Sequence, residues 1–74
     1  MNQKMNMGAA VRARREALHL TQPEVAKRCG TSQSHMSRIE SNKCVPSALL
    51  LARLASTLRI PVTELLEAAQ RKAV

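Results

Sequence analysis

The chain has 74 residues and a mass of 8.1 kDa, which is enough for one small domain but not for two separate hydrophobic cores. Twelve lysines and arginines against five glutamates and no aspartate give a net charge of +7 and an isoelectric point near 10.8. This balance favours a polyanionic partner, nucleic acid ahead of an anionic membrane surface. The absence of Phe, Tyr and Trp argues against RNA and single-strand modules, which stack bases on aromatic rings.

Membrane-spanning and secreted proteins are also disfavoured. The longest apolar run, residues 48–52, is far too short to cross a bilayer. The residues before Gly8 lack the apolar stretch of a secretory signal. Two cysteines, Cys29 and Cys44, do not make a disulfide framework and fit a reducing compartment. We therefore expect a small, soluble, cytoplasmic domain.

Hydrophobic spacing predicts an all-α chain of five short helices. The first covers about residues 8–18, after a loose arm over residues 1–6. The fourth starts at Pro46-Ser47, and the fifth opens at Pro61 with Arg71-Lys72 near its end, where cations suit the helix dipole. The positions that we expect to face the core in these three helices are Met7, Ala10, Val11, Leu18, Leu51, Leu54, Ala55, Leu58, Leu65 and Leu66.

The second helix has clear signals at both ends. Thr21 and Glu24 have the spacing of a capping box, in which each side chain binds the other residue's backbone N–H. Pro23 lies in the first turn, where its missing N–H costs nothing. The helix should stop at Cys29, because Gly30 supplies a left-handed turn.

The third helix, residues 33–40, is expected to begin after a Ser32 cap and to have two unlike faces. Met36 and Ile39 are three residues apart and face inward. The other face carries only polar or cationic side chains, those of Gln33, Ser34, Ser37 and Arg38. A helix with one thin apolar edge presents the remainder of its surface to solvent or to a partner.

Residues 22–41 are the most informative stretch of the sequence, because they predict two short helices joined by a tight turn. Two such helices can pack at a steep angle only if the residues between them are small or apolar. The residues that meet this requirement are Val25, Ala26, Cys29, Gly30, Met36 and Ile39. The pattern Leu20-Thr21-Gln22-Pro23-Glu24-Val25-Ala26, then Gly30, then Ser37-Arg38-Ile39-Glu40 and Pro46, resembles the Cro/cI-type (XRE) helix-turn-helix family of phage and bacterial repressors. The resemblance covers about residues 7–66.

This resemblance implies a compact five-helix, lambda-repressor-like domain over residues 7–69, with a tail over residues 70–74. It also implies that the third helix lies in the DNA major groove, usually in a symmetric dimer on a palindromic operator. By position, the residues that would face base edges are Gln33, Ser34, Ser37 and Arg38. Those that would contact phosphates are Gln22, Ser32 and Lys43. Arg15 and Glu40 match a buried ion pair that serves as scaffold.

The chemistry of these side chains suits the implied roles. Arg38 can donate two hydrogen bonds to guanine, and Gln33 can pair in the same way with adenine. Sequence-independent attraction to DNA would come from Lys4, Arg12, Arg14, Lys27, Arg28 and Lys43.

A dimer interface is expected where apolar residues exceed the needs of a small core. Leu49 and Leu50 form such an excess, together with Leu66 and Ala69 on the last helix. Additional core packing is an equal alternative for these residues.

The chain departs from the family pattern at four positions. His19, Asn42 and Arg59 stand where glycines often end helices, and Arg59 in particular should cost roughly 1 kcal/mol relative to glycine if its φ is positive. Arg14 stands where many relatives have an apolar residue, so the packing of the first helix is open there.

Neither metal binding nor catalysis is favoured. The cysteines and histidines, Cys29, Cys44, His19 and His35, lack the paired spacing of zinc ligands. With no aspartate and no glycine-rich phosphate loop, we expect no enzyme activity, no catalytic residues and no cofactor. Cys29 is predicted to be a core residue, while a redox role for Cys44 is the less favoured alternative to an ordinary loop residue.

We therefore interpret the chain as a sequence-specific, double-stranded DNA-binding transcriptional regulator, most simply a homodimeric repressor. Its length suits a phage or plasmid repressor, a restriction–modification controller or an antitoxin. RNA polymerase or a toxin is a candidate protein partner. A protein-interaction module with the same fold is the main alternative. Membrane binding is weakly supported, because the basic residues do not form one face opposite a broad apolar face.

Overall fold

A computed structural model describes residues 6–70 and shows an all-α domain. The five helices are α1 (Met7–Ala17), α2 (Gln22–Cys29), α3 (Gln33–Glu40), α4 (Ala48–Leu58) and α5 (Val62–Ala69). The predicted fold class is therefore confirmed. The proposed arm and the Arg71-Lys72 end lie, except for residue 6, outside the described residues. No helix within residues 6–70 has the length and apolar character needed to cross a membrane.

Four of the five helices, α1 to α4, begin where a side chain caps the first turn. The Asn6 side chain accepts a hydrogen bond from the Ala9 N–H at 3.0 Å, so α1 starts one residue earlier than predicted. The capping box of Thr21 and Glu24 is present, as predicted. Hydrogen bonds from the Thr21 backbone and hydroxyl lower the pKa of Glu24. Ser32 caps α3, and Ser47 caps α4.

Left-handed residues end several helices, and three of them are not glycine. Gly30 follows α2 with φ of 71°, as its position predicts. His19, Asn42 and Arg59 have φ of 58°, 61° and 58°, so they adopt the conformation that glycine would adopt at lower cost. Arg59, which ends α4, therefore carries the expected backbone strain of roughly 1 kcal/mol.

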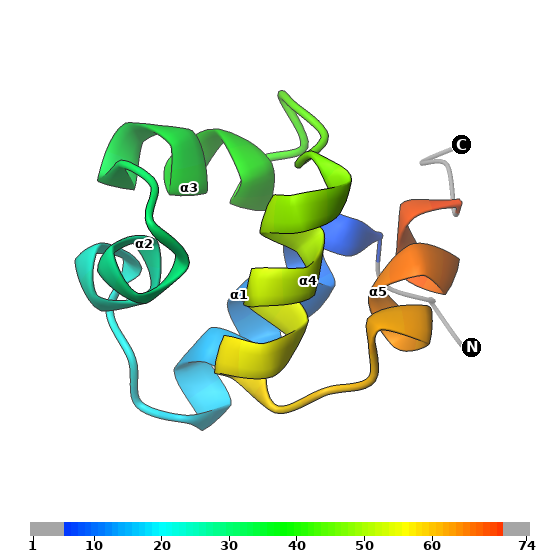
Figure 1. The fold of residues 1–74 in the computed structure, drawn as a ribbon, viewed down its shortest axis with the longest axis horizontal. Helices are drawn as coiled ribbons and strands as arrows, with labels where there is room; N and C mark the ends of the chain where they lie inside the picture. The colour runs from blue at the N-terminus through cyan, green and yellow to red at the C-terminus, as the bar shows by residue number, and fades with distance from the viewer. Residues whose placement is uncertain (1–5, 71–74) are drawn as a thin grey trace.

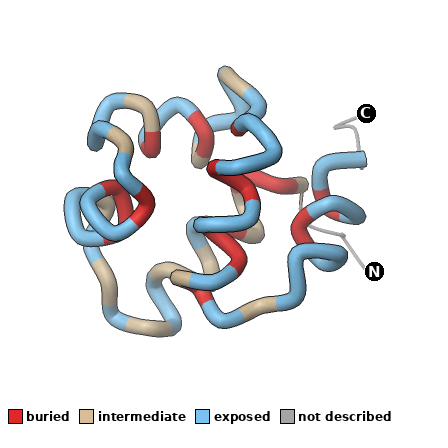
Figure 2. The backbone as a smooth tube through the Cα atoms, in the orientation of Figure 1, coloured by how far each residue is buried: buried red, intermediate tan, exposed pale blue. Residues whose placement is uncertain are grey.

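The core lies where the inner faces of all five helices meet. Figure 1 shows α4 crossing the middle of the molecule and packing on α1, with α2 and α3 on one side and α5 on the other. The buried segments in Figure 2 all face this centre. The largest fully buried side chains are Val11, Val25, Cys29, Met36, Ile39, Leu54, Leu58 and Leu65. Cys29 is thus a core residue, as predicted.

The leucine pairs at residues 49–50 and 65–66 each have one exposed and one buried member. Leu66, which was expected to face inward, is 44% exposed, because its neighbour Leu65 occupies the core side of α5. Leu50, for which a dimer interface and core packing were equal expectations, is 8% exposed and belongs to the core, whereas Leu49 is 62% exposed. Leu49 and Leu66 each lie about 100° around the helix from a buried neighbour, which takes their side chains off the core-facing side.

Arg14, at the position where the family resemblance leads one to expect an apolar residue, has hydrogen-bond acceptors for its guanidinium. Its Nε donates to the Leu58 carbonyl at 2.8 Å, and its Nη2 donates to the Arg59 carbonyl at 3.4 Å. These carbonyls end α4, where backbone acceptors lack helical partners and a cation is favourable. Arg14 therefore joins α1 to the end of α4 by hydrogen bonds rather than by apolar packing.

The start of α1 lies directly against the end of α3. The Gly8 N–H donates to the Asn42 side-chain oxygen at 3.0 Å, and the Asn42 amide donates to Asn6 at 3.0 Å. A Cβ atom at Gly8 would overlap the backbone carbonyl oxygen of Glu40. Glycine is required here because it lets the two backbones approach each other.

We predict that Gly8→Ala lowers the free energy of unfolding by about 1–3 kcal/mol, because the added methyl group forces α1 away from α3. Urea denaturation followed by circular dichroism measures this change. The exposed Ala17, replaced by serine, is the control for adding one atom to the same helix and should change stability by less than about 0.5 kcal/mol. Helix propensity alone favours alanine over glycine, so a stabilised Gly8→Ala variant would contradict the close approach.

Candidate nucleic-acid interface

The central unit of the site is the pair of helices α2 and α3, joined by the turn at Gly30. Val25, Ala26 and Cys29 of α2 are buried, and so are Met36 and Ile39 of α3. The steep packing of the two helices leaves the opposite side of α3 uncovered. The side chains exposed there are those of Gln33, Ser34, Ser37 and Arg38.

The three residues expected to contact phosphates lie around α3. Ser32 precedes this helix, and its hydroxyl oxygen accepts from the His35 N–H at 3.1 Å. Lys43 follows the helix with an exposed side chain, while its backbone N–H donates to the Arg38 carbonyl at 2.8 Å. Gln22 is the first residue of α2 and is half-buried, because its amide is directed toward Glu40.

Arg15 and Glu40 form a nearly buried ion pair between α1 and α3. The Arg15 Nε donates to Glu40 Oε2 at 2.6 Å, and Nη2 donates to Oε1 at 3.1 Å. The side chains are 12% and 5% exposed. Hydrogen bonding to Glu40 raises the pKa of Arg15, and its remaining Nη1 donates to the Leu20 carbonyl at 2.8 Å. The pair thereby connects α1, the segment entering α2, and α3.

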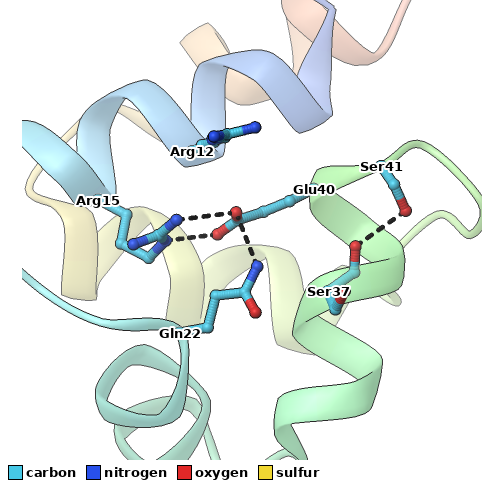
Figure 3. Close-up of a pocket in the computed structure, with 6 residues that line it drawn as sticks. All are labelled: Arg12, Arg15, Gln22, Ser37, Glu40 and Ser41. Carbon is cyan, nitrogen blue, oxygen red and sulfur yellow. Dashed lines mark hydrogen bonds and ion pairs between the residues drawn. The ribbon is translucent and has the colours of Figure 1, made fainter.

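A hollow of about 310 Å³ adjoins this ion pair. Figure 3 shows Gln22 on one side and Ser37 on another, with Arg12 above them on α1. The hollow is lined by Arg12, Arg15, Gln22, Ser37, Glu40 and Ser41. Two cations and one carboxylate therefore surround it. Ser37 belongs to the exposed face of α3, so the hollow borders that face.

The cysteines and histidines show no metal centre in the part of the chain that the structure describes. No three metal-ligating side chains gather within residues 6–70. The Cys29 sulfur lies 3.5 Å from the Thr57 hydroxyl, inside the core. The Cys44 sulfur lies 3.9 Å from Nδ1 of His35, and both side chains are half-buried.

An apolar strip runs along the exterior of the domain on α5 and nearby residues. Val62, Leu66 and Ala69 are exposed at a spacing that places them along one side of α5. Val45, which is 81% exposed, lines a small hollow together with Ala69. Leu49, in the first turn of α4, is exposed as well, and these five exposed residues together are called the apolar strip. Sequence reasoning missed Val45 and Val62, because isolated valines beside prolines give no helical period.

The comparisons with known proteins agree with this geometry. A family model described as a helix-turn-helix domain matches residues 6–68. The ImmF control region 10 kDa protein of Bacillus phage phi105 is 34% identical over 59 residues, which are 80% of this chain and 66% of that protein. The chain belongs to the Cro/cI-type helix-turn-helix family of transcriptional regulators.

Two solved structures are similar over most of the chain. The P22 c2 repressor, determined in complex with a synthetic operator, has a TM-score of 0.84 and 29% identity, and the match covers 88% of this chain and 98% of that one. The restriction–modification controller protein C.AhdI from Aeromonas hydrophila has a TM-score of 0.75 and 29% identity, with 80% and 89% coverage. The fold is that of regulators in this family.

We predict that Glu40→Ala lowers the free energy of unfolding by about 3–5 kcal/mol, because it leaves the nearly buried Arg15 guanidinium without its charged partner. Thermal and urea unfolding measure the loss. Glu16→Ala is the matched control, since its pair with Arg12, at 3.4 Å, is exposed and should contribute less than about 1 kcal/mol. Equal losses from the two substitutions would show that the Arg15–Glu40 pair behaves as an ordinary surface pair.

Proposed function

We propose that this chain is a sequence-specific repressor that binds a palindromic DNA operator as a homodimer, with α3 of each protomer in the major groove. The observation that carries the proposal is the exposed polar face of α3, presented by a helix-turn-helix whose apolar residues are buried between its helices and the core. The net charge of +7 supports a polyanionic partner. The similarity to the P22 c2 repressor, which was solved with an operator, supports the same class of partner. Such a protein acts in the cytoplasm, which we propose as its location.

In this proposal, the α3 side chains read base edges. The Arg38 guanidinium donates two hydrogen bonds to guanine O6 and N7, and the Gln33 amide pairs with adenine. Ser34 and Ser37 are short and make hydrogen bonds with either partner of a base pair. Each bidentate contact contributes about 1–3 kcal/mol of discrimination against the wrong base.

Phosphate contacts fix the position of α3 but carry no sequence information. Ser32 before the helix, Lys43 after it and Gln22 at the start of α2 are the proposed donors. The Ser32 hydroxyl accepts from the His35 N–H, so its own hydrogen is available to a phosphate oxygen.

The apolar strip is the proposed dimer interface. Leu49, Leu66 and Ala69 were expected there from the sequence, and Val45 and Val62 extend the same surface. Leu50 is left out, because it is buried in its own protomer. A second copy is the proposed occupant, since a palindromic operator requires two α3 helices related by a two-fold axis.

The first experiment compares the fluorescence anisotropy of labelled DNA from upstream of the chain's own gene with that of a shuffled duplex, over a salt series. We predict a large preference for the native fragment and a linear fall of log affinity with log salt, because phosphate contacts release counterions. If the native fragment shows no preference, a duplex selected from a random library replaces it. No sequence preference in either test would contradict the proposal.

Two variants separate the roles of the interface residues. Arg38→Ala should cost about 1–3 kcal/mol on the operator and relax base choice at one position per half-site. Lys43→Ala is its counterpart, because it should weaken all duplexes alike and reduce the salt slope by about one for each phosphate that the lysine neutralises. If Arg38→Ala instead weakens every sequence equally, Arg38 contacts phosphate and not a base.

We also predict that Leu66→Glu converts the dimer to a monomer, because it places a carboxylate within the apolar strip of both partners. Sedimentation equilibrium at micromolar concentration measures the mass. Ala17→Glu adds the same charge at an exposed position on α1 and should leave the dimer intact. A wild-type chain that sediments as a monomer at this concentration would defeat the dimer proposal.

A further inference from the structure

The Glu40 carboxylate accepts hydrogen bonds from Gln22 as well as from its ionic partner Arg15. Besides the two hydrogen bonds from Arg15, its Oε1 accepts one from Gln22 Nε2 at 3.1 Å. An ionised carboxylate can only accept hydrogen bonds, so it must face the nitrogen of the Gln22 amide and not the oxygen. Glu40 therefore determines which way this amide is turned. The scaffold pair and the start of α2 are joined through one side chain.

The Gln22 amide retains a donor after this contact is made. Its nitrogen carries two hydrogens, and the bond to Glu40 uses one of them. Gln22 lines the hollow between α1, α2 and α3, where Ser37 of the exposed α3 face lies on another wall. An acceptor that enters the hollow can therefore receive the second hydrogen.

The charges around the hollow suit an anion. Arg15 neutralises the Glu40 carboxylate through two hydrogen bonds, which prevents that carboxylate from repelling an incoming anion. Arg12 is then the remaining cation of the lining, and its pair with Glu16 is long and exposed. The hollow thus has one fixed amide donor and one cation beside the proposed reading helix.

We propose that Glu40 is a positioning residue for DNA binding, which holds the Gln22 amide so that it donates to a backbone phosphate seated in this hollow. Arg12 supplies the charge for the same phosphate. The inference rests on the proposed function, and it adds a second role to a residue otherwise counted as scaffold. It also assigns to Arg12, so far one of several cations that attract DNA, a particular phosphate.

The substitution that tests this role is Glu40→Gln, which preserves size and still offers an oxygen to Arg15. An amide can present either its oxygen or its nitrogen to Gln22, so the variant no longer dictates how the Gln22 amide is turned. It also removes one negative charge, which strengthens binding to any DNA. A double-mutant cycle with Gln22→Ala cancels this general effect, because the charge changes equally in both backgrounds.

Four proteins are compared by anisotropy on the same duplex: wild type, Glu40→Gln, Gln22→Ala and the double variant. We expect the effect of Glu40→Gln on Kd to differ between the two backgrounds by about tenfold, with the greater weakening where Gln22 is present. Effects that agree within about twofold would overturn the positioning role, as would a Gln22→Ala variant that binds as tightly as wild type. Melting curves recorded in the binding buffer ensure that each variant is compared below its transition.

The role of Arg12 has its own measurement. Arg12→Ala should reduce the salt slope by about one, because the variant neutralises one phosphate fewer. Arg59→Gly removes an equal charge from a different hollow, lined also by Leu18 and Thr57, and should leave the slope unchanged. Equal slopes for Arg12→Ala and wild type would remove Arg12 from the phosphate seat.

The failure of the inference and of the proposed function can be told apart. If wild type shows no selective DNA binding, the proposed function fails and the positioning role fails with it. If wild type binds selectively but the cycle is additive, only the positioning role fails, and Glu40 remains a scaffold residue.

Discussion

The ion pair of Arg15 and Glu40 fixes the geometry on which the remainder of the domain depends. Removing a guanidinium and a carboxylate from water is costly, and the cost is offset only when their hydrogen bonds are satisfied. Here Arg15 donates to both Glu40 oxygens and to the Leu20 carbonyl, so the pair holds α1, the entry to α2 and the end of α3 at once. The Gly8 contact brings the same two helices, α1 and α3, together at the start of α1. The orientation of the exposed α3 face follows from these polar links as well as from the core.

Polar links matter in this chain because its core contains no aromatic side chain. Leu, Ile, Val, Met, Ala and Cys bury less surface per residue than Phe or Trp, and three non-glycine residues with positive φ add strain. Several cations therefore serve the scaffold: Arg14 binds the end of α4, and Arg53 donates to the Cys29 carbonyl at the end of α2. The net charge consequently overstates the number of side chains free to contact DNA.

Local features of this fold could be predicted from the spacing of residues. Among the long-range contacts, only the Arg15–Glu40 pair was anticipated, and that came from the family resemblance. The capping box at Thr21 and the turn at Gly30 depend on residues a few positions apart, and the sequence places both correctly. The choice between Leu65 and Leu66 depends on how α5 packs against α1 and α4, which no local spacing determines. The partners of Arg14 are 44 and 45 residues away, and the Gln22–Glu40 bond joins residues 18 apart. Such links become visible only once the helices are placed.

In the proposed function, specificity depends on the apolar strip as much as on α3. One copy of α3 offers only two side chains, Arg38 and Gln33, that can make bidentate contacts with bases, and each contributes about 1–3 kcal/mol. Phosphate contacts add affinity for every sequence and so cannot improve the ratio between operator and other DNA. A symmetric dimer doubles the discriminating free energy, because both half-sites must match at once. Val45 belongs to the apolar strip and lies only five residues after the end of α3. A dimer interface that includes Val45 therefore also sets the distance between the two α3 helices.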